Sequence, residues 1–264
     1  MTSPEVQAPG PLFAAGEDDD RSSHAHRLLI GVLGLLLPIL LWLIAAWRPT
    51  QQVGRWDPLS SVSAYYYSGA VAVFVGILIA LGVFLFTYRG YDNESLDRDR
   101  ATAIIAGGAA VLVAFFPTRA TCGLAAPSWW TPIMGTIHLG AATVLFGAFI
   151  HFSLFLFPQS GVKAEARQAG KRWRNGIYRV CGWAMVVCVV WAGVAARRDA
   201  SIFLAEALAL EFFAVSWLVK GRVDRTAVAA KQRAQYYRRH PGRLVGDAWS
   251  AIRGSRGKRG TGAP

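Results

Sequence analysis

Long uncharged apolar windows dominate this sequence and limit what the chain can fold into. Of its 264 residues, 53% are hydrophobic. They gather in windows of about 20 residues and do not recur at the periods of a soluble helix or strand. A segment inside a bilayer must satisfy its own backbone hydrogen bonds, so these windows predict helices. Barrel strands would be about ten residues long with alternating polarity, a pattern that the sequence does not show.

Six windows fit membrane-spanning helices, and the predicted fold class is an all-α, polytopic transmembrane helix bundle. The predicted spans are 28–47, 68–88, 101–117, 132–157, 178–196 and 200–219. We expect a disordered N-terminal tail over 1–27, and a basic juxtamembrane helix with a disordered cytoplasmic tail over 220–264. The tail before the first span lacks the basic start and apolar core of a signal peptide, which predicts an uncleaved first span.

The distribution of Lys and Arg predicts the orientation of the bundle. With a cytoplasmic N-terminus, 23 of the 28 Lys and Arg residues lie in cytoplasmic segments. Basic residues near span ends favour the cytoplasmic side, so both termini are predicted there, in a multi-pass protein of the bacterial plasma membrane. The net charge of +12 then indicates anionic lipid head groups at the cytoplasmic face as partners. No nucleic-acid-binding motif occurs, and we expect no nucleic-acid partner.

Polar residues gather at the predicted outer ends of the spans. SSVSAYYYS (60–68) precedes the second span, and FPTRATCGLAAPSWW (116–130) joins the third and fourth. His138 and Glu206 each lie about six residues into a span, near 9 Å below its outer end. Ionisable groups at that depth usually face the bundle interior and find a partner, so we expect the two to meet. The sequence therefore predicts an outward-facing polar pocket for a small or lipid-like ligand, lined by Ser63, Tyr65, Tyr66, Thr118, His138 and Glu206.

Two alternative functions stay open. A zinc-dependent membrane lipid hydrolase would use His138 and Glu206, with Asp57 as a further carboxylate. The chain has no HxxxH or HExxH pair for such a metal site. Considered separately as a nucleophile, Ser63 lacks a surrounding GxSxG motif. A proton-coupled carrier would instead protonate Glu206 and Glu211, which lie five residues apart and on different faces of one helix. The leading interpretation has no enzymatic activity and requires no cofactor or metal.

Aromatic residues near the span ends predict a membrane-interface belt. The outer belt would contain the tyrosine triplet 65–67 together with Trp47, Trp56, Trp129 and Trp130. At the inner ends, Trp217 and Lys220 of SWLVKG are predicted interface anchors.

Residues 28–222 resemble a group of bacterial integral-membrane proteins with six spans. The resemblance lies in SSVSAYYYSGAVAVFVGILIALGVFLFTYRGYD, FFPT, RNGIYRVCG and SWLVKG. That group is distantly similar to the autophagy-modulator and ceramidase-like membrane proteins. The ceramidase-like superfamily uses a serine, an aspartate and three histidines around zinc. This chain offers Ser63 and His138 but no pair of histidines on a late span. The resemblance therefore implies the six-span fold, with zinc hydrolysis as the alternative activity.

Overall fold

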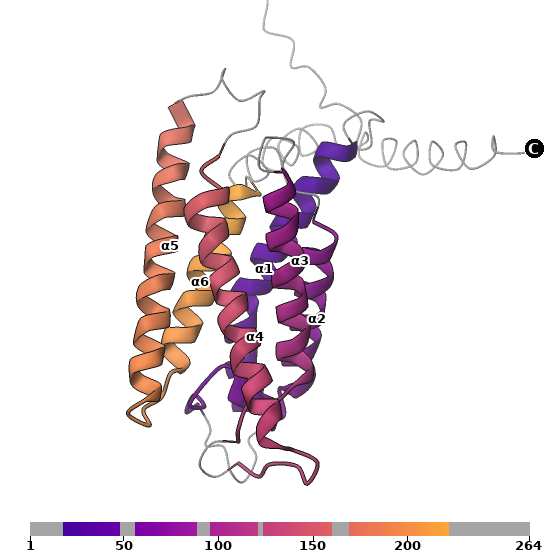
Figure 1. Cartoon of the computed structure of the whole chain (residues 1–264), viewed down its shortest axis with the longest axis vertical. Coiled ribbons are helices and arrows are strands. Elements are labelled where there is room, and N and C mark those ends of the chain that lie inside the picture. The colour runs from indigo at the N-terminus through magenta and orange to yellow at the C-terminus, as the bar shows by residue number, and fades with distance from the viewer. Residues whose placement is uncertain (1–17, 48–55, 89–95, 121–123, 160–168, 222–264) are drawn as a thin grey trace, which may run out of the picture. The chain divides into compact units, whose positions relative to one another are not determined.

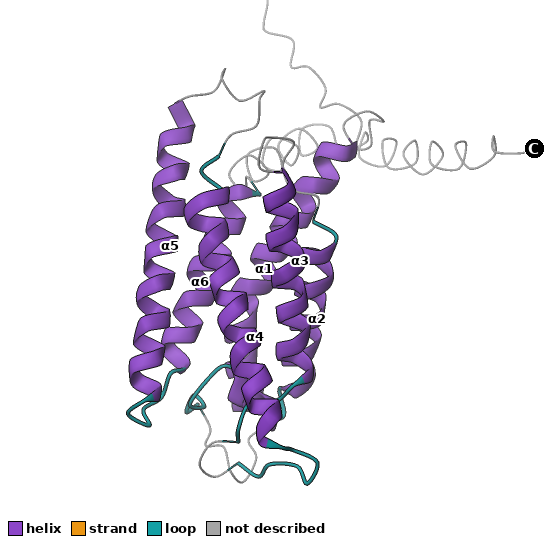
Figure 2. Ribbon diagram, in the orientation of Figure 1, coloured by secondary structure: helices purple, strands orange, loops and turns teal. Residues whose placement is uncertain are grey.

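The described residues of the computed structural model form six α-helices and two short helical turns, with no strand among them (Figures 1 and 2). They are residues 18–47, 56–88, 96–120, 124–159 and 169–221. The chain divides into two units, one being Ala25–Gly221 and the other Met1–His24 with Arg222–Pro264. Of the second unit, only the start of the first helix is described. The predicted tails therefore lie mostly outside the described residues.

The helices end where the apolar windows end. They are α1 (Asp18–Trp47), η1 (Ser63–Tyr67, a 3₁₀ turn), α2 (Val71–Phe86), α3 (Leu96–Phe115), α4 (Pro132–His151), η2 (Phe152–Leu156, a π-helical turn), α5 (Ala169–Ala196) and α6 (Phe203–Lys220). Three of them, α1, α3 and α5, begin before the predicted starts at 28, 101 and 178. Hydropathy detects only the apolar part of a helix, whereas acidic residues such as Asp97 and Asp99 favour the first turn of α3. The all-helical fold class is confirmed for the described residues.

Three helices are long and apolar enough to cross a membrane. They are Ala25–Trp47, Pro132–Leu156 and Arg172–Ala196. The apolar helix α2 has 16 residues, or roughly 24 Å at 1.5 Å per residue, which is less than the hydrocarbon thickness of about 30 Å. In α6, Glu206, Glu211 and Lys220 reduce the mean hydropathy. By length and composition, three helices are therefore able to cross a membrane, where the sequence predicted six spans.

Successive helices run in opposite directions, so their connections gather at two ends of the bundle (Figure 1). The loop end holds the described residues of 56–70, 116–131 and 197–202. Hydrogen bonds join these segments. The Tyr67 hydroxyl donates to the Thr118 carbonyl over 2.5 Å, and the Ile202 amide donates to the Ser60 carbonyl over 2.7 Å. Segments far apart in the sequence are thus bonded to one another at the loop end.

Glycines set the closest helix contacts. A Cβ placed on Gly107 of α3 would lie 2.9 Å from the carbonyl oxygen of Gly82 on α2. On α1, a Cβ at Gly34 would lie 2.9 Å from the Phe213 ring of α6. Small residues allow helix backbones to approach each other, and this is the main source of helix contact where lipid surrounds the bundle. These glycines hold α2 against α3 and α1 against α6.

Aromatic rings and a buried lysine fill the end of the bundle opposite the loop end. The Trp217 indole is fully buried, with its ring centroid 5.2 Å from Tyr88 and 5.1 Å from Phe157. Lys220 is 8% exposed, and its Nζ donates to the Phe157 carbonyl over 3.0 Å. The same Nζ lies 5.9 Å from the Tyr178 ring centroid. The interface-anchor prediction for Trp217 and Lys220 is wrong, because both side chains pack inside the bundle.

The contact between α2 and α3 predicts different effects of the same substitution at two neighbouring glycines. Gly107→Ala places a methyl group against the Gly82 carbonyl, whereas the nearest atom to a Cβ on Gly108 is 3.9 Å away. We expect Gly107→Ala to lower the free energy of unfolding by about 1–3 kcal/mol relative to Gly108→Ala, because the backbones must separate. Denaturant titration of both variants in detergent measures the difference. Equal stabilities would contradict the close α2–α3 contact.

Candidate functional site

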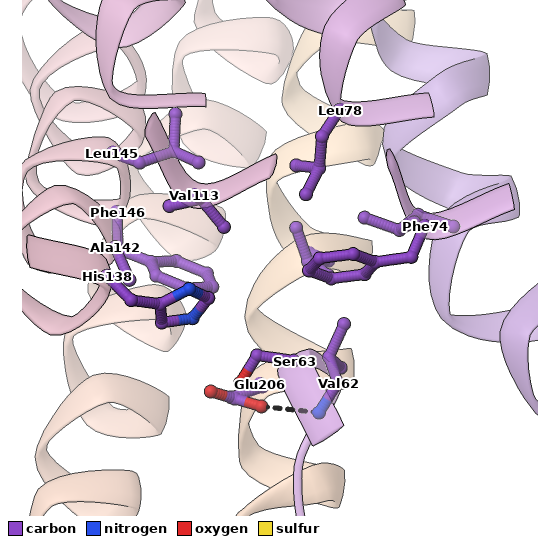
Figure 3. Close-up of a pocket in the computed structure, with 12 residues that line it drawn as sticks. Val62, Ser63, Phe74, Leu78, Val113, His138, Ala142, Leu145, Phe146 and Glu206 are labelled. Carbon is purple, nitrogen blue, oxygen red and sulfur yellow. Dashed lines mark hydrogen bonds between the residues drawn. The ribbon is translucent and has the colours of Figure 1, made fainter. Parts of the chain in front are cut away.

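A small cavity of about 40 Å³ lies between α1, α2, α3, α4, α6 and η1 (Figure 3). Three polar side chains line it: Ser63, His138 and Glu206. The rest of the lining is apolar and includes Leu37, Phe74, Leu78, Val113, Leu145 and Phe146. Figure 3 places Leu78 and Leu145 at one side of the space and Ser63 and Glu206 at the other. This volume has room for about three water molecules, and the lining combines an apolar body with a few convergent polar groups, as small-molecule sites do.

Glu206 is fixed by the backbone of the segment before η1. Its Oε2 accepts a hydrogen bond from the Val62 amide over 2.7 Å. The Ser60 carbonyl also accepts from the Phe203 amide over 3.0 Å and from the Ser201 hydroxyl over 3.2 Å. These bonds tie residues 60–62 to the first turn of α6, where amides lack partners within the helix. The second carboxylate oxygen of Glu206 takes part in no hydrogen bond among the described residues and faces the cavity (Figure 3).

His138 enters the cavity from the first half of α4. Its side chain is 4% exposed, and its Nδ1 lies 2.7 Å from the Phe116 carbonyl oxygen. A carbonyl only accepts, so Nδ1 carries the proton, and in the neutral ring Nε2 is an acceptor. Figure 3 shows the imidazole and the Glu206 carboxylate turned toward the same space. The two predicted partners therefore line one cavity, but each bonds a backbone group and no described hydrogen bond joins them.

The end of α3 explains why His138 bonds a carbonyl. The helix stops at Phe115, and Pro117 prevents it from continuing. The next carbonyls must find donors outside the helix. Side chains from three parts of the chain supply them over 2.7, 3.2 and 2.5 Å: His138 Nδ1 to Phe116, Trp130 Nε1 to Pro117, and the Tyr67 hydroxyl to Thr118. His138 thus supports the end of α3 as well as lining the cavity.

The other predicted site residues lie beside the cavity and are not among the residues that line it. Tyr65 is fully buried, and its hydroxyl accepts from the Leu59 amide over 3.3 Å. Tyr66 packs its ring on Phe74, with centroids 6.3 Å apart. Thr118 contributes its carbonyl to the Tyr67 hydroxyl. Glu211 lies further along α6, outside the lining.

Three tryptophans of the predicted aromatic belt are exposed, whereas Tyr65 is buried. Trp47 is 81% exposed, and Trp56 and Trp129 are more than half exposed. Tyr65 instead packs against Phe203, with ring centroids 5.7 Å apart. Burial raises the pKa of the Tyr65 hydroxyl, although the hydrogen bond from the Leu59 amide works against this. The three tyrosines have identical side chains, but the 3₁₀ turn points these side chains in different directions.

Helical spacing from the predicted residues could have identified part of the apolar lining. Ala142 and Leu145 are four and seven residues after His138, and Leu210 is four residues after Glu206. Residues at those spacings share a helix face. Val62 and Phe116 contribute through backbone groups, for which the identity of the side chain carries no signal.

Few of the described residues could act as metal ligands together. Within the described ranges, no three His, Cys, Asp or Glu residues gather closely enough to hold a metal ion. Asp57 is exposed and is not among the cavity-lining residues. Comparisons with protein-family models, with curated proteins and with solved structures find no match to this chain.

The hydrogen bond at Thr118 predicts that only one of two adjacent tyrosine hydroxyls contributes to stability. Burial, and to a lesser extent Tyr66, raises the pKa of Tyr67, so its hydroxyl remains a donor at neutral pH. Tyr67→Phe removes the bond to the Thr118 carbonyl, and we expect a loss of about 1 kcal/mol in the free energy of unfolding. Tyr66→Phe is the matched control, since no described hydrogen bond involves its hydroxyl. Equal denaturation midpoints for the two variants would show that Tyr67 does not support this carbonyl.

Proposed function

We propose that this protein crosses the bacterial plasma membrane six times and holds a small or lipid-like ligand in an outward-facing cavity. The observation that carries the proposal is the cavity itself, which joins Ser63, His138 and Glu206 to an apolar interior. Such an arrangement suits a ligand with one polar end and an apolar body. The resemblance to six-span bacterial membrane proteins belongs to the same proposal.

Six spans are supported by the alternating directions of the helices. α2, α3 and α6 each connect the same two ends as the three long apolar helices (Figure 1). Each of the three also presents exposed apolar side chains, such as Val83 on α2, Ile105 on α3 and Leu204 on α6, as helices in contact with lipid do. The excess of Lys and Arg at the end opposite the loop end supports cytoplasmic termini and binding to anionic head groups. The most basic segments, 163–168 and 222–240, lie outside the described residues.

Binding is favoured over catalysis by the partners of Ser63. A serine nucleophile needs a base within hydrogen-bond reach. The Ser63 hydroxyl instead pairs with the Ser61 hydroxyl over 3.2 Å, and no described hydrogen bond joins it to His138. A proton-coupled carrier using Glu206 and Glu211 would need both groups on one path, whereas Glu211 lies outside the cavity lining. Ligand binding requires none of these additional features.

The proposed orientation predicts opposite labelling of two exposed aspartates. Asp57 lies at the loop end, and Asp97 lies in the first turn of α3 at the opposite end. In a chain with Cys122, Cys181 and Cys188 replaced by alanine, we expect an impermeant thiol reagent on intact cells to label Asp57→Cys. Asp97→Cys should react only after the membrane is permeabilised. The reverse pattern, or labelling of both variants from outside, would contradict the proposed topology.

The proposed cavity predicts that a bulky residue at one position blocks ligand entry. Ala142 lines the cavity, whereas Val144 on the same helix is 47% exposed and points outward. We expect ethanol, whose three heavy atoms match the volume of the cavity, to bind beyond simple partition into lipid when it is titrated calorimetrically into the full chain in zwitterionic nanodiscs. Ala142→Leu should weaken this binding and Ala142→Trp should abolish it, while Val144→Trp should leave it unchanged. Identical heats for the chain, Ala142→Trp and Val144→Trp would overturn the binding proposal.

A further inference from the structure

The cavity is small and polar at one end, and these are the conditions under which a protein binds ordered water. Its volume of about 40 Å³ suits about three water molecules, and a buried water typically makes about three hydrogen bonds. Ser63, His138 and Glu206 line the space, and Figure 3 shows the imidazole and the carboxyl group turned toward it. The hydroxyl, the Nε2 atom and the second carboxyl oxygen can all bond water. The volume and the polar lining together match a cluster of bound water.

The two ionisable groups of the cavity constrain each other's charge. Of the described residues that line it, only His138 from α4 and Glu206 from α6 have ionisable side chains. The lining from α1, α2 and α3 is apolar, and η1 adds Ser63. A net charge in apolar surroundings is costly. His138 and Glu206 are neutral together when they hold one proton in addition to the proton on His138 Nδ1.

The other titratable groups near Glu206 do not reach this space. Tyr65 of η1 packs on Phe203 of α6 and bonds the Leu59 amide through its hydroxyl. Glu211 lies on α6 outside the lining. The charged side chains of the loop end are exposed and do not line the cavity; they are Asp57, Arg119, Arg197, Arg198 and Asp199. The charge of the cavity therefore depends on His138 and Glu206.

We propose that the cavity is a hydrated proton-binding site, in which bound water links Glu206 to His138 and the two side chains share one proton. The proton lies on the second Glu206 oxygen, or it passes through the water to His138 Nε2 and leaves Glu206 as a carboxylate. Each water in between accepts one proton and gives one up, so the net charge of the pair stays zero. His138 Nδ1 bonds the Phe116 carbonyl and Glu206 bonds the Val62 amide in both forms.

This proposal goes beyond the proposed function, because it concerns the cavity when it holds no organic ligand. Water and a proton are both supplied by the solvent, so no further reactant is needed. The backbone bonds at 2.7 Å hold each side chain in place, and the proton moves between them without a change in the helices. The site thus binds a proton in one place and offers no path across the bundle.

Nuclear magnetic resonance of the unaltered full chain in zwitterionic nanodiscs tests the shared proton. Isotope labels at the glutamate Cδ atoms and in the histidine rings report the protonation of Glu206 and of His138 Nε2. We expect the two fractional protonations to add up to one proton at neutral pH, where an exposed glutamate is ionised. Both signals should change with a common midpoint as the pH is raised, because coupled groups titrate as a pair. A sum near zero, or two separate midpoints, would overturn the proposal.

A matched pair of variants locates the second group. His138→Asn places an amide nitrogen near the position of Nδ1, so it keeps a donor for the Phe116 carbonyl and loses Nε2. His151→Asn makes the same change at the end of α4, outside the lining. We expect His138→Asn to lower the pH at which Glu206 loses its proton by roughly one unit, because the proton then has one group to occupy. Equal midpoints in the two variants would show that His138 does not share the proton.

The role of water is tested by filling the cavity. Ala142 lines the space, so Ala142→Leu should displace water and separate the midpoints of Glu206 and His138. Val144→Leu enlarges a side chain that is 47% exposed on the same helix and should keep the common midpoint. A common midpoint in Ala142→Leu would contradict the link through water.

These outcomes are distinct from those of the proposed function. Binding of ethanol to a chain without the shared proton would overturn this proposal and leave the proposed function standing. A shared proton in a chain that does not bind ethanol would do the reverse. The measurement on the unaltered chain does not depend on the folding of any variant.

Discussion

The hydrogen bond from the Val62 amide to the Glu206 carboxylate holds the loop end of the structure together. An amide left unsatisfied away from water costs about 1–3 kcal/mol, so the segment before η1 is stable in this position only with such a partner. The same bond orients the carboxylate, leaving one oxygen directed into the cavity (Figure 3). Removing Glu206 would therefore leave the Val62 amide without this partner, while the Ser60 carbonyl would still bond the Ile202 and Phe203 amides.

Carbonyl groups at the helix ends have no partner within the helix, and in this bundle side chains from other elements bond them. The carbonyls after α3 bond His138, Trp130 and Tyr67. At the opposite end, Lys220 satisfies the Phe157 carbonyl, which follows the π-helical turn η2. Each donor comes from a different helix or loop than its acceptor. The polar groups of the bundle thus connect its elements, whereas the apolar residues and glycines determine how closely the helices approach.

Hydropathy and depth predicted the parts of this structure that depend on side-chain polarity. The helix ends followed from the apolar windows, and the similar depths of His138 and Glu206 predicted that they would lie near one another. The structure shows that His138 and Glu206 bond backbone groups of Phe116 and Val62 and not each other. The sequence could not predict these partners, because every residue carries the same backbone groups. Tyr65, Trp217 and Lys220 misled the sequence interpretation because amphipathic side chains can pack inward or reach the interface. Only the tertiary arrangement decides between these two environments.

The fixed positions of Glu206 and His138 favour holding a ligand over moving a proton. Each side chain is oriented by a backbone partner at 2.7 Å, so little side-chain freedom remains to be lost when a ligand binds. A carrier that uses Glu206 and Glu211 would need both carboxyl groups on one path through the bundle. Glu211 lies outside the cavity lining, so the arrangement of these two residues favours a single site at Glu206.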